Sequence, residues 1–64
     1  NCVTAGGVFN DHNDAFVKAY SNKVPMGRMA NREELVGIII YLLSDSASYV
    51  TGQNFIIDGG FTTW

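Results

Sequence analysis

A short apolar run framed by glycines near the end of the chain most constrains what this sequence can fold into. Phe55-Ile56-Ile57 follows a turn at Gly52 and precedes Asp58-Gly59-Gly60. Consecutive apolar residues, in contrast to an alternating pattern, are typical of a strand that is covered on both faces, as in a parallel sheet. Glycines before and after the run indicate tight turns. We therefore expect a buried strand over residues 53–58, with a parallel partner elsewhere in the chain.

The partner strand is predicted at the opposite end of the sequence. Residues 1–4 are part β-branched and run directly into Ala5-Gly6-Gly7, a pattern that indicates a strand ending in a loop. Taken by themselves, the two glycines favour a plain turn over a phosphate cradle. Cys2 lies on this strand, so we expect a small buried side chain rather than a reactive thiol.

A short helix is predicted over residues 14–22, where the apolar residues fall on one face. Asp11 or Asn13 is placed to cap its start, and Pro25 prevents its easy continuation. Residues 23–29 then form an irregular connector.

A longer helix is predicted from Asn31 to about Ser44. Asn31 and Glu34 have the spacing of a capping box, and Glu33 and Glu34 lie at the positive end of the helix dipole. The apolar residues form a stripe at helical spacing (Leu35, Ile38, Ile39, Leu42, Leu43) and extend beyond it (Val36, Ile40, Tyr41). A helix that is apolar on most of its circumference is buried on more than one side. We expect one side to pack on the sheet and the other on a second helix.

Two parallel strands joined by a helical crossover form a βαβ unit, which predicts an α/β fold. A parallel sheet of two strands leaves both edges open and is not expected to persist alone. A chain of 64 residues also buries only about 60% of its unfolded surface. Its one cysteine excludes an internal disulfide. One cysteine and one histidine are too few for a zinc site with four protein ligands, so no metal is expected. Association with more protein is the remaining means of stabilisation. The start at Asn1 rather than Met indicates a fragment or a processed product.

The charge content excludes several partners. Charged residues make up 16% of the chain, below the usual quarter, which indicates surface intended for burial against other protein. A net charge of −2 offers no basic patch for nucleic acid. No apolar run approaches the ~18 residues of a membrane span. One cysteine and no signal pattern predict a cytoplasmic protein.

Two motifs carry a family resemblance that covers nearly the whole chain. The chain opens with Asn1-Cys2-Val3-Thr4-Ala5-Gly6-Gly7-Val8-Phe9-Asn10 and later carries Ser44-Asp45-Ser46-Ala47-Ser48-Tyr49-Val50-Thr51-Gly52, followed by Ile57-Asp58-Gly59-Gly60. In this order they resemble the C-terminal end of the short-chain dehydrogenase/reductase family. There the sixth strand ends in Asn-x-Val-x-Pro-Gly-x-Ile-x-Thr, and the last strand ends in Val-Asp-Gly-Gly.

The resemblance implies the last βαβ unit of a doubly wound, Rossmann-type parallel sheet. Residues 1–10 would hold the strand end and the nicotinamide-side loop, and residues 11–30 the substrate-loop region. Residues 31–45 would form an interface helix, and residues 46–64 the turn, the last strand and an apolar tail that ends at Trp64. The helix and the last strand would join subunits of a homo-oligomer.

The resemblance also implies NAD or NADP as cofactor and a small carbonyl or alcohol substrate. Gly6, Val8 and Asn10 are the implied cofactor-binding residues, with the Val8 backbone on the carboxamide and an Asn10 side-chain hydrogen bond. Asn10 replaces the family's threonine. Ala5 replaces the family's proline, and the loss of its fixed φ loosens the turn. The connector resembles both acyl-carrier-protein reductases and enzymes of nucleotide or bacterial surface sugars, and both substrate classes stay open.

No catalytic residue carries over. The family's Tyr-x-x-x-Lys pair with an upstream Ser and Asn is not met, because Tyr20 and Lys23 are three residues apart. We expect Tyr20 to be an apolar-face residue and Lys23 to be solvated, so the chain alone is expected to be inactive. A non-enzymatic alternative is a self-association module without cofactor binding.

Some other polar and aromatic residues have ordinary structural interpretations. His12 is expected in a surface loop, and Asp58 is expected to serve the turn before the paired glycines. Four residues of the substrate-loop region and its approach either line a substrate pocket or pack the short helix: Phe9, Phe16, Tyr20 and Met26.

Overall fold

A computed structural model describes residues 1–63 of the chain. Its elements, in chain order, are β1 (Cys2–Ala5), α1 (Asp14–Ser21), α2 (Glu33–Leu43), the 3₁₀ turn η1 (Asp45–Ala47), β2 (Asn54–Ile57) and the 3₁₀ turn η2 (Phe61–Thr63). The expected tail includes Trp64, which lies outside the described residues.

The strands β1 and β2 pair in parallel, as predicted from the two ends of the sequence. Cys2 pairs with Asn54 and Ala5 with Ile57, with no bulge between them. The ladder extends one bond beyond each end, from Cys2 N–H to the Gln53 carbonyl at 2.8 Å and from Gly6 N–H to the Ile57 carbonyl at 2.9 Å. The chain between the strands carries both α-helices, so the described residues form a βαβ unit.

Helix α1 starts with the predicted side-chain cap, whereas α2 starts with only half of the predicted capping box. The Asn13 side chain accepts a hydrogen bond from Phe16 N–H at 2.8 Å and caps α1. The Glu34 carboxylate accepts one from Asn31 N–H at 2.9 Å. In return, Glu34 N–H donates to the Asn31 carbonyl rather than to its side chain, so regular helix begins at Glu33, two residues later than predicted.

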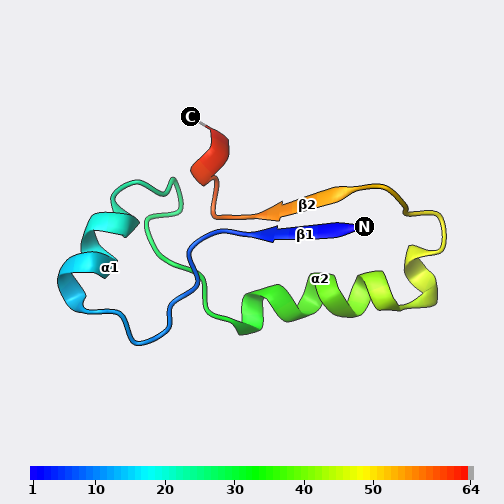
Figure 1. Ribbon diagram of the computed structural model, residues 1–64, viewed down its shortest axis with the longest axis horizontal. Coiled ribbons are helices and arrows are strands. Elements are labelled where there is room, and N and C mark those ends of the chain that lie inside the picture. Colours follow the sequence, from blue (N-terminus) through cyan, green and yellow to red (C-terminus); the bar gives the residue numbers. More distant parts are fainter. Residues whose placement is uncertain (64) are drawn as a thin grey trace.

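Helix α2 runs alongside the strand pair and opposite to it in direction (Figure 1). Leu35, Ile38 and Leu42 are its half-buried apolar residues. Two other members of the predicted stripe are exposed, Ile39 at 45% and Leu43 at 84%. The stripe is therefore narrower than predicted, because only the helix positions that point toward the strands gain cover. No helix among residues 1–63 has the length and apolarity to cross a membrane.

The strand pair is covered on one face only within residues 1–63. Val3, Phe55 and Ile57 are half-buried, whereas Cys2 is exposed and Ile56 is 49% exposed. The expectation of a buried Cys2 is wrong for this structure. Successive side chains of a strand point to opposite faces, and Cys2 and Ile56 point away from the half-buried positions.

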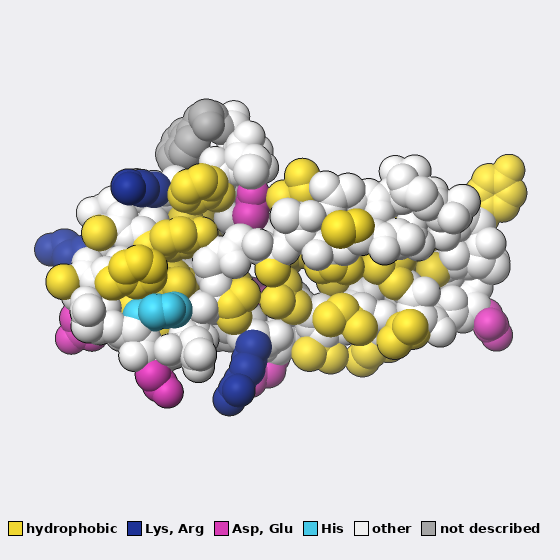
Figure 2. All heavy atoms as spheres, viewed as in Figure 1, with side chains coloured by type: hydrophobic (Ala, Val, Ile, Leu, Met, Phe, Trp, Pro, Cys, Tyr) yellow, Lys and Arg dark blue, Asp and Glu magenta, His cyan; other side chains and the backbone are white. Residues whose placement is uncertain are grey.

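The molecule is flat and lacks a complete core. It measures 42 × 25 × 14 Å, and its radius of gyration of 13.6 Å exceeds the roughly 10.7 Å of a compact chain of this length. The buried apolar residues of the described chain are Val24, Met29 and Ala47. Its accessible surface is 4865 Å², against about 4,000 Å² for a globular monomer of this mass. Figure 2 shows apolar side chains gathered on the surface along α2 and beside α1.

Candidate functional site

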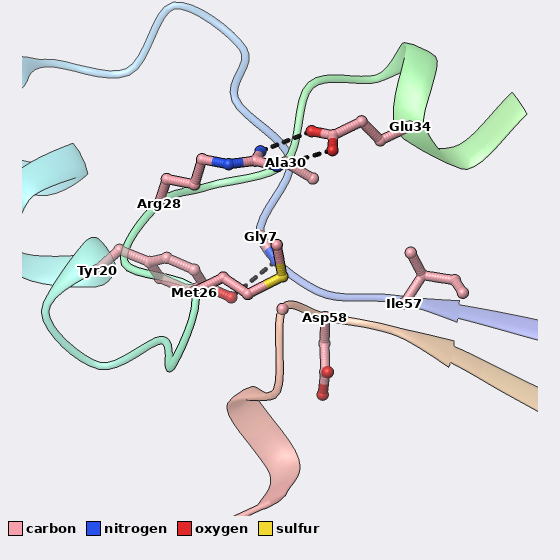
Figure 3. Close-up of a pocket in the computed structure, with 9 residues that line it drawn as sticks. Gly7, Tyr20, Met26, Arg28, Ala30, Glu34, Ile57 and Asp58 are labelled. Atoms are coloured by element: carbon pink, nitrogen blue, oxygen red, sulfur yellow. Dashed lines mark hydrogen bonds and ion pairs between the residues drawn. The ribbon is translucent and has the colours of Figure 1, made fainter.

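Three segments converge beyond the carboxyl ends of β1 and β2 (Figure 3): the loop after β1, the connector between α1 and α2, and the Asp58–Gly60 turn. Ligands of parallel α/β sheets bind at this end of the strands. A pocket of about 80 Å³ lies here. Its lining residues are Gly7, Tyr20, Met26, Arg28, Ala30, Glu34, Ile57, Asp58 and Gly59.

The loop after β1 is fastened to Ala30 by an isolated parallel bridge at Val8. Ala30 N–H donates to the Gly7 carbonyl at 2.9 Å, and Phe9 N–H donates to the Ala30 carbonyl at 2.8 Å. These bonds use groups on either side of Val8. Val8 is half-buried, and its own N–H and C=O make no hydrogen bond within residues 1–63. Partly buried backbone polar groups usually find a partner, which can be protein, water or a ligand.

The two glycines of this loop are required by close packing. A Cβ on Gly6 would lie 2.7 Å from Asp58 Cβ, and a Cβ on Gly7 would lie 2.4 Å from ring atoms of Tyr20. Neither glycine has a positive φ. Gly7 N–H donates to the Tyr20 hydroxyl at 2.7 Å, so it is already engaged.

Asn10 lies at the exposed end of the same loop. Its backbone N–H donates to Nδ1 of His12 at 3.4 Å, and its side-chain amide makes no hydrogen bond within residues 1–63. Asn10 and Phe9 line a second, shallow hollow of about 180 Å³, together with Asn31 and Arg32 at the start of α2. His12 is exposed, as expected of a surface loop.

The strongest polar contact of the site is an ion pair that sequence reasoning missed. Two guanidinium nitrogens of Arg28 contact the two Glu34 oxygens at 2.6 and 2.8 Å. The hydrogen bond from Arg28 lowers the pKa of Glu34 from 4.5 to about 2, and the bond from Asn31 N–H acts in the same direction. The pair ties the connector to the first turn of α2. No helical spacing signals it, because Arg28 lies outside the helix, beyond a turn at Gly27 with φ of 75°.

Tyr20 joins three parts of the chain. Its ring stacks with Phe16 at a centroid distance of 6.2 Å and with Phe61 at 5.7 Å, while its hydroxyl holds Gly7. Lys23 follows in the turn after α1, where its backbone N–H donates to the Tyr20 carbonyl at 2.9 Å. Of the four aromatic and methionine residues considered above, Tyr20 and Met26 line the pocket of about 80 Å³ and Phe9 lines the second hollow. Phe16 packs between His12 and Tyr20.

Asp58 has the structural role that its position indicates. Its carboxylate accepts hydrogen bonds from Gly60 N–H at 2.9 Å, from Thr62 N–H at 3.1 Å and from the Thr62 hydroxyl at 2.8 Å. The Thr62 hydroxyl is the main cause of a lowered pKa for Asp58. These bonds close the turn after β2 and start η2. No group of three or more metal-ligating side chains occurs among residues 1–63.

Comparison with known proteins agrees with the parallel α/β arrangement. The chain matches the family model described as enoyl-(acyl carrier protein) reductase over residues 2–62. It also superimposes on a short chain dehydrogenase from Leptospira borgpetersenii with bound NAD+, with a TM-score of 0.88 and 48% identity. That match covers 95% of this chain and 24% of the other. This chain belongs to the short-chain dehydrogenase/reductase family.

The names of some other relatives specify polyhydroxylated compounds as substrates. The chain is 54% identical over 46 residues to the ribulose-forming D-arabinitol 2-dehydrogenase of Candida tropicalis, covering 70% of this chain. It spans only 16% of the length of that relative. A gluconate 5-dehydrogenase from Burkholderia cenocepacia, solved with NADP and tartrate, has a TM-score of 0.85 at 28% identity, over 97% of this chain and 27% of its own.

Proposed function

We propose that this chain is the C-terminal part of an NAD(P)-dependent short-chain dehydrogenase/reductase, supplying the last βαβ unit of its sheet. When bound, the cofactor accepts or donates the hydride that interconverts a hydroxyl and a carbonyl. The contribution of this chain is to bind and orient the nicotinamide end through residues 6–10.

The observation that carries the proposal is the free backbone pair of Val8. Its neighbours Gly7 and Phe9 are fastened to Ala30, so the N–H and C=O of Val8 have a defined direction. One donor and one acceptor in fixed geometry suit a carboxamide, which has both a carbonyl acceptor and N–H donors. The Asn10 side chain, without a partner in residues 1–63, is available for a further hydrogen bond to carboxamide or phosphate. Gly6 allows the close approach of Asp58 that shapes the loop.

Catalysis itself needs residues that this sequence does not contain. The Tyr-x-x-x-Lys pair of the family is absent, and the nearest pair, Tyr20 and Lys23, has the wrong spacing. We propose that the chain by itself does not turn over substrate. The proton-transfer residues and the dinucleotide-binding glycines would come from the longer polypeptide.

The substrate would be a small alcohol or carbonyl compound, with polyols and ketoses tested first. This choice is supported by relatives named D-arabinitol 2-dehydrogenase, NADP-dependent mannitol dehydrogenase and NADH-dependent L-xylulose reductase. Residues 11–30, which include α1, would form the substrate side of the site.

The homo-oligomer interface is proposed at residues 31–45 and the last strand. Support comes from the apolar residues that α2 leaves exposed on its outer side, including Val36, Ile40 and Leu43. The incomplete core and the open strand face also require cover, from the rest of the domain or from a neighbouring subunit. We further propose that the assembled enzyme is cytoplasmic and contacts neither nucleic acid nor membrane.

The test is made on the complete polypeptide in which these residues occur, by titrating NAD(H) and NADP(H) and following protein fluorescence. Val8→Pro removes the N–H donor, whereas Val8→Ala keeps the backbone and trims the side chain. Loss of one hydrogen bond of ~1–1.5 kcal/mol predicts a roughly tenfold rise in cofactor Kd for Val8→Pro and little change for Val8→Ala. Equal cofactor affinity of the two variants would remove Val8 from the site.

The alternative function is a self-association module without cofactor. It predicts an oligomer with no affinity for either dinucleotide. Absence of binding by the complete polypeptide at millimolar cofactor would therefore favour this alternative and overturn the proposed oxidoreductase function.

A further inference from the structure

Tyr20 connects two regions that the proposed function assigns to different ligands. It lies in the last turn of α1, on the substrate side. Its hydroxyl accepts a hydrogen bond from Gly7 N–H at 2.7 Å, drawn as a dashed line in Figure 3. Gly7 directly precedes Val8, whose backbone is the proposed nicotinamide contact. One hydrogen bond between residues 13 apart thus joins the substrate side to the cofactor side.

The Tyr20 ring fits its position closely. A Cβ at residue 7 would approach Cε1 and Cζ of the ring to 2.4 Å, so only glycine admits the ring there. The ring is also stacked with Phe16 of α1 at an interplanar angle of 25° and with Phe61 of η2 at 15°. A displacement of α1 therefore moves the hydroxyl relative to Gly7.

The loop that receives this bond has little freedom to absorb a displacement. Ala30 bonds to the Gly7 carbonyl at 2.9 Å and to Phe9 N–H at 2.8 Å, from the connector. Tyr20 and Ala30 thus engage the N–H and the C=O of the same residue, Gly7. The two bonds therefore hold the peptide units on either side of Gly7, and the second of these units carries the Val8 N–H.

We propose that Tyr20 is a positioning residue that couples the binding of substrate over α1 to the binding of nicotinamide at Val8. The proposal rests on the proposed function and deepens it. Substrate bound against α1 holds the Tyr20 hydroxyl on Gly7 N–H and so keeps the Val8 backbone aligned for the carboxamide. By linkage, bound cofactor raises substrate affinity by the same factor. One neutral hydrogen bond predicts a factor of about five to ten.

The test compares cofactor Kd without and with a saturating polyol, in the complete polypeptide and in two variants. D-arabinitol is the first polyol tried, and mannitol is the second. Tyr20→Phe removes only the hydroxyl and keeps the stacked ring. Tyr49→Phe makes the same chemical change at a side chain that is 100% exposed, and is the matched control. Hydrogen exchange of the Gly7 amide, followed by NMR, reports directly on the bond.

The expected result is that polyol lowers the cofactor Kd five- to tenfold in the unmodified enzyme and in Tyr49→Phe. In Tyr20→Phe the factor falls to less than two, and the Gly7 amide exchanges faster. An equal decrease of cofactor Kd in Tyr20→Phe would overturn the coupling and leave the proposed function intact. The same conclusion would follow if the unmodified enzyme bound cofactor with a Kd that neither polyol changed. An unmodified enzyme that binds neither dinucleotide would overturn both.

Discussion

At the scale of single residues, the site depends on a few polar contacts between segments. Arg28 and Glu34 form two short hydrogen bonds, and Arg28 also donates to the Met29 carbonyl at 3.2 Å. The next residue, Ala30, holds the loop at Gly7 and Phe9. The ion pair is largely solvent-exposed, with side-chain exposures of 47% and 40%. Its main effect is therefore geometric rather than a large gain in stability.

This ion pair predicts an acid-sensitive contact. The folded-state pKa of Glu34 is about 2, below its usual 4.5, so stabilisation by the carboxylate is complete above 4.5 and is lost as the pH falls toward 2. A carboxyl-carbon NMR titration should show Glu34 with a midpoint near 2. In Arg28→Met the midpoint should rise toward 4.5, whereas Arg32→Met should leave it in place. A midpoint near 4.5 in the unmodified protein would contradict the pair.

At the scale of elements, α2 contains one residue with a much lower helix propensity than the others. Gly37 lies in the middle of the helix, and a Cβ added there would meet no atom within 4 Å. Gly7 differs in its surroundings, because its missing Cβ makes room for the Tyr20 ring. Substitution by alanine is therefore expected to change stability in opposite directions at Gly37 and Gly7.

We predict that Gly37→Ala stabilises the fold by about 0.5–1 kcal/mol, because alanine loses less backbone entropy in a helix. Gly7→Ala should destabilise it by about 1–3 kcal/mol, because the ring must move. Urea unfolding with a common m-value measures both changes. A destabilised Gly37→Ala would instead show that another chain or segment closes on that part of α2.

At the scale of the whole molecule, the dominant feature is a large accessible surface area for the mass of the chain. The chain exposes several hundred Å² more than a compact monomer of its mass, comparable to one side of a standard interface of ~800 Å². Exposed apolar residues are concentrated along α2 (Figure 2). This supports the proposal that α2 meets further protein, as expected of an element near a subunit boundary.

The interface proposal predicts the effect of a charge on the outer side of α2. Ile40 is 62% exposed in the single chain. Ile40→Glu would bury a carboxylate in the assembly, so the subunit Kd should rise at least 100-fold in sedimentation experiments on the complete polypeptide. Ala19→Glu adds the same charge at an exposed position of α1 and should leave association unchanged. Unaltered association of Ile40→Glu would place the interface elsewhere.

The sequence alone determined the elements and their class, because those depend on local rules. Consecutive apolar residues at Phe55 to Ile57 and glycines beyond them indicated the parallel strand that β2 became. The Asn13 cap and the Glu34 contact with Asn31 N–H also follow from spacings of three residues. Family membership was equally accessible, since its motifs are contiguous.

Only the tertiary structure decided how the site is held together. Tyr20 and Ala30 both contact Gly7, and Arg28 contacts Glu34. Each contact depends on the path of a loop, which the spacing of apolar residues does not predict. It also decided which face of each element is covered, leaving Cys2 and Leu43 exposed against expectation. The physical reason is that burial depends on what packs against an element, whereas hydrophobic spacing records only what the element can offer.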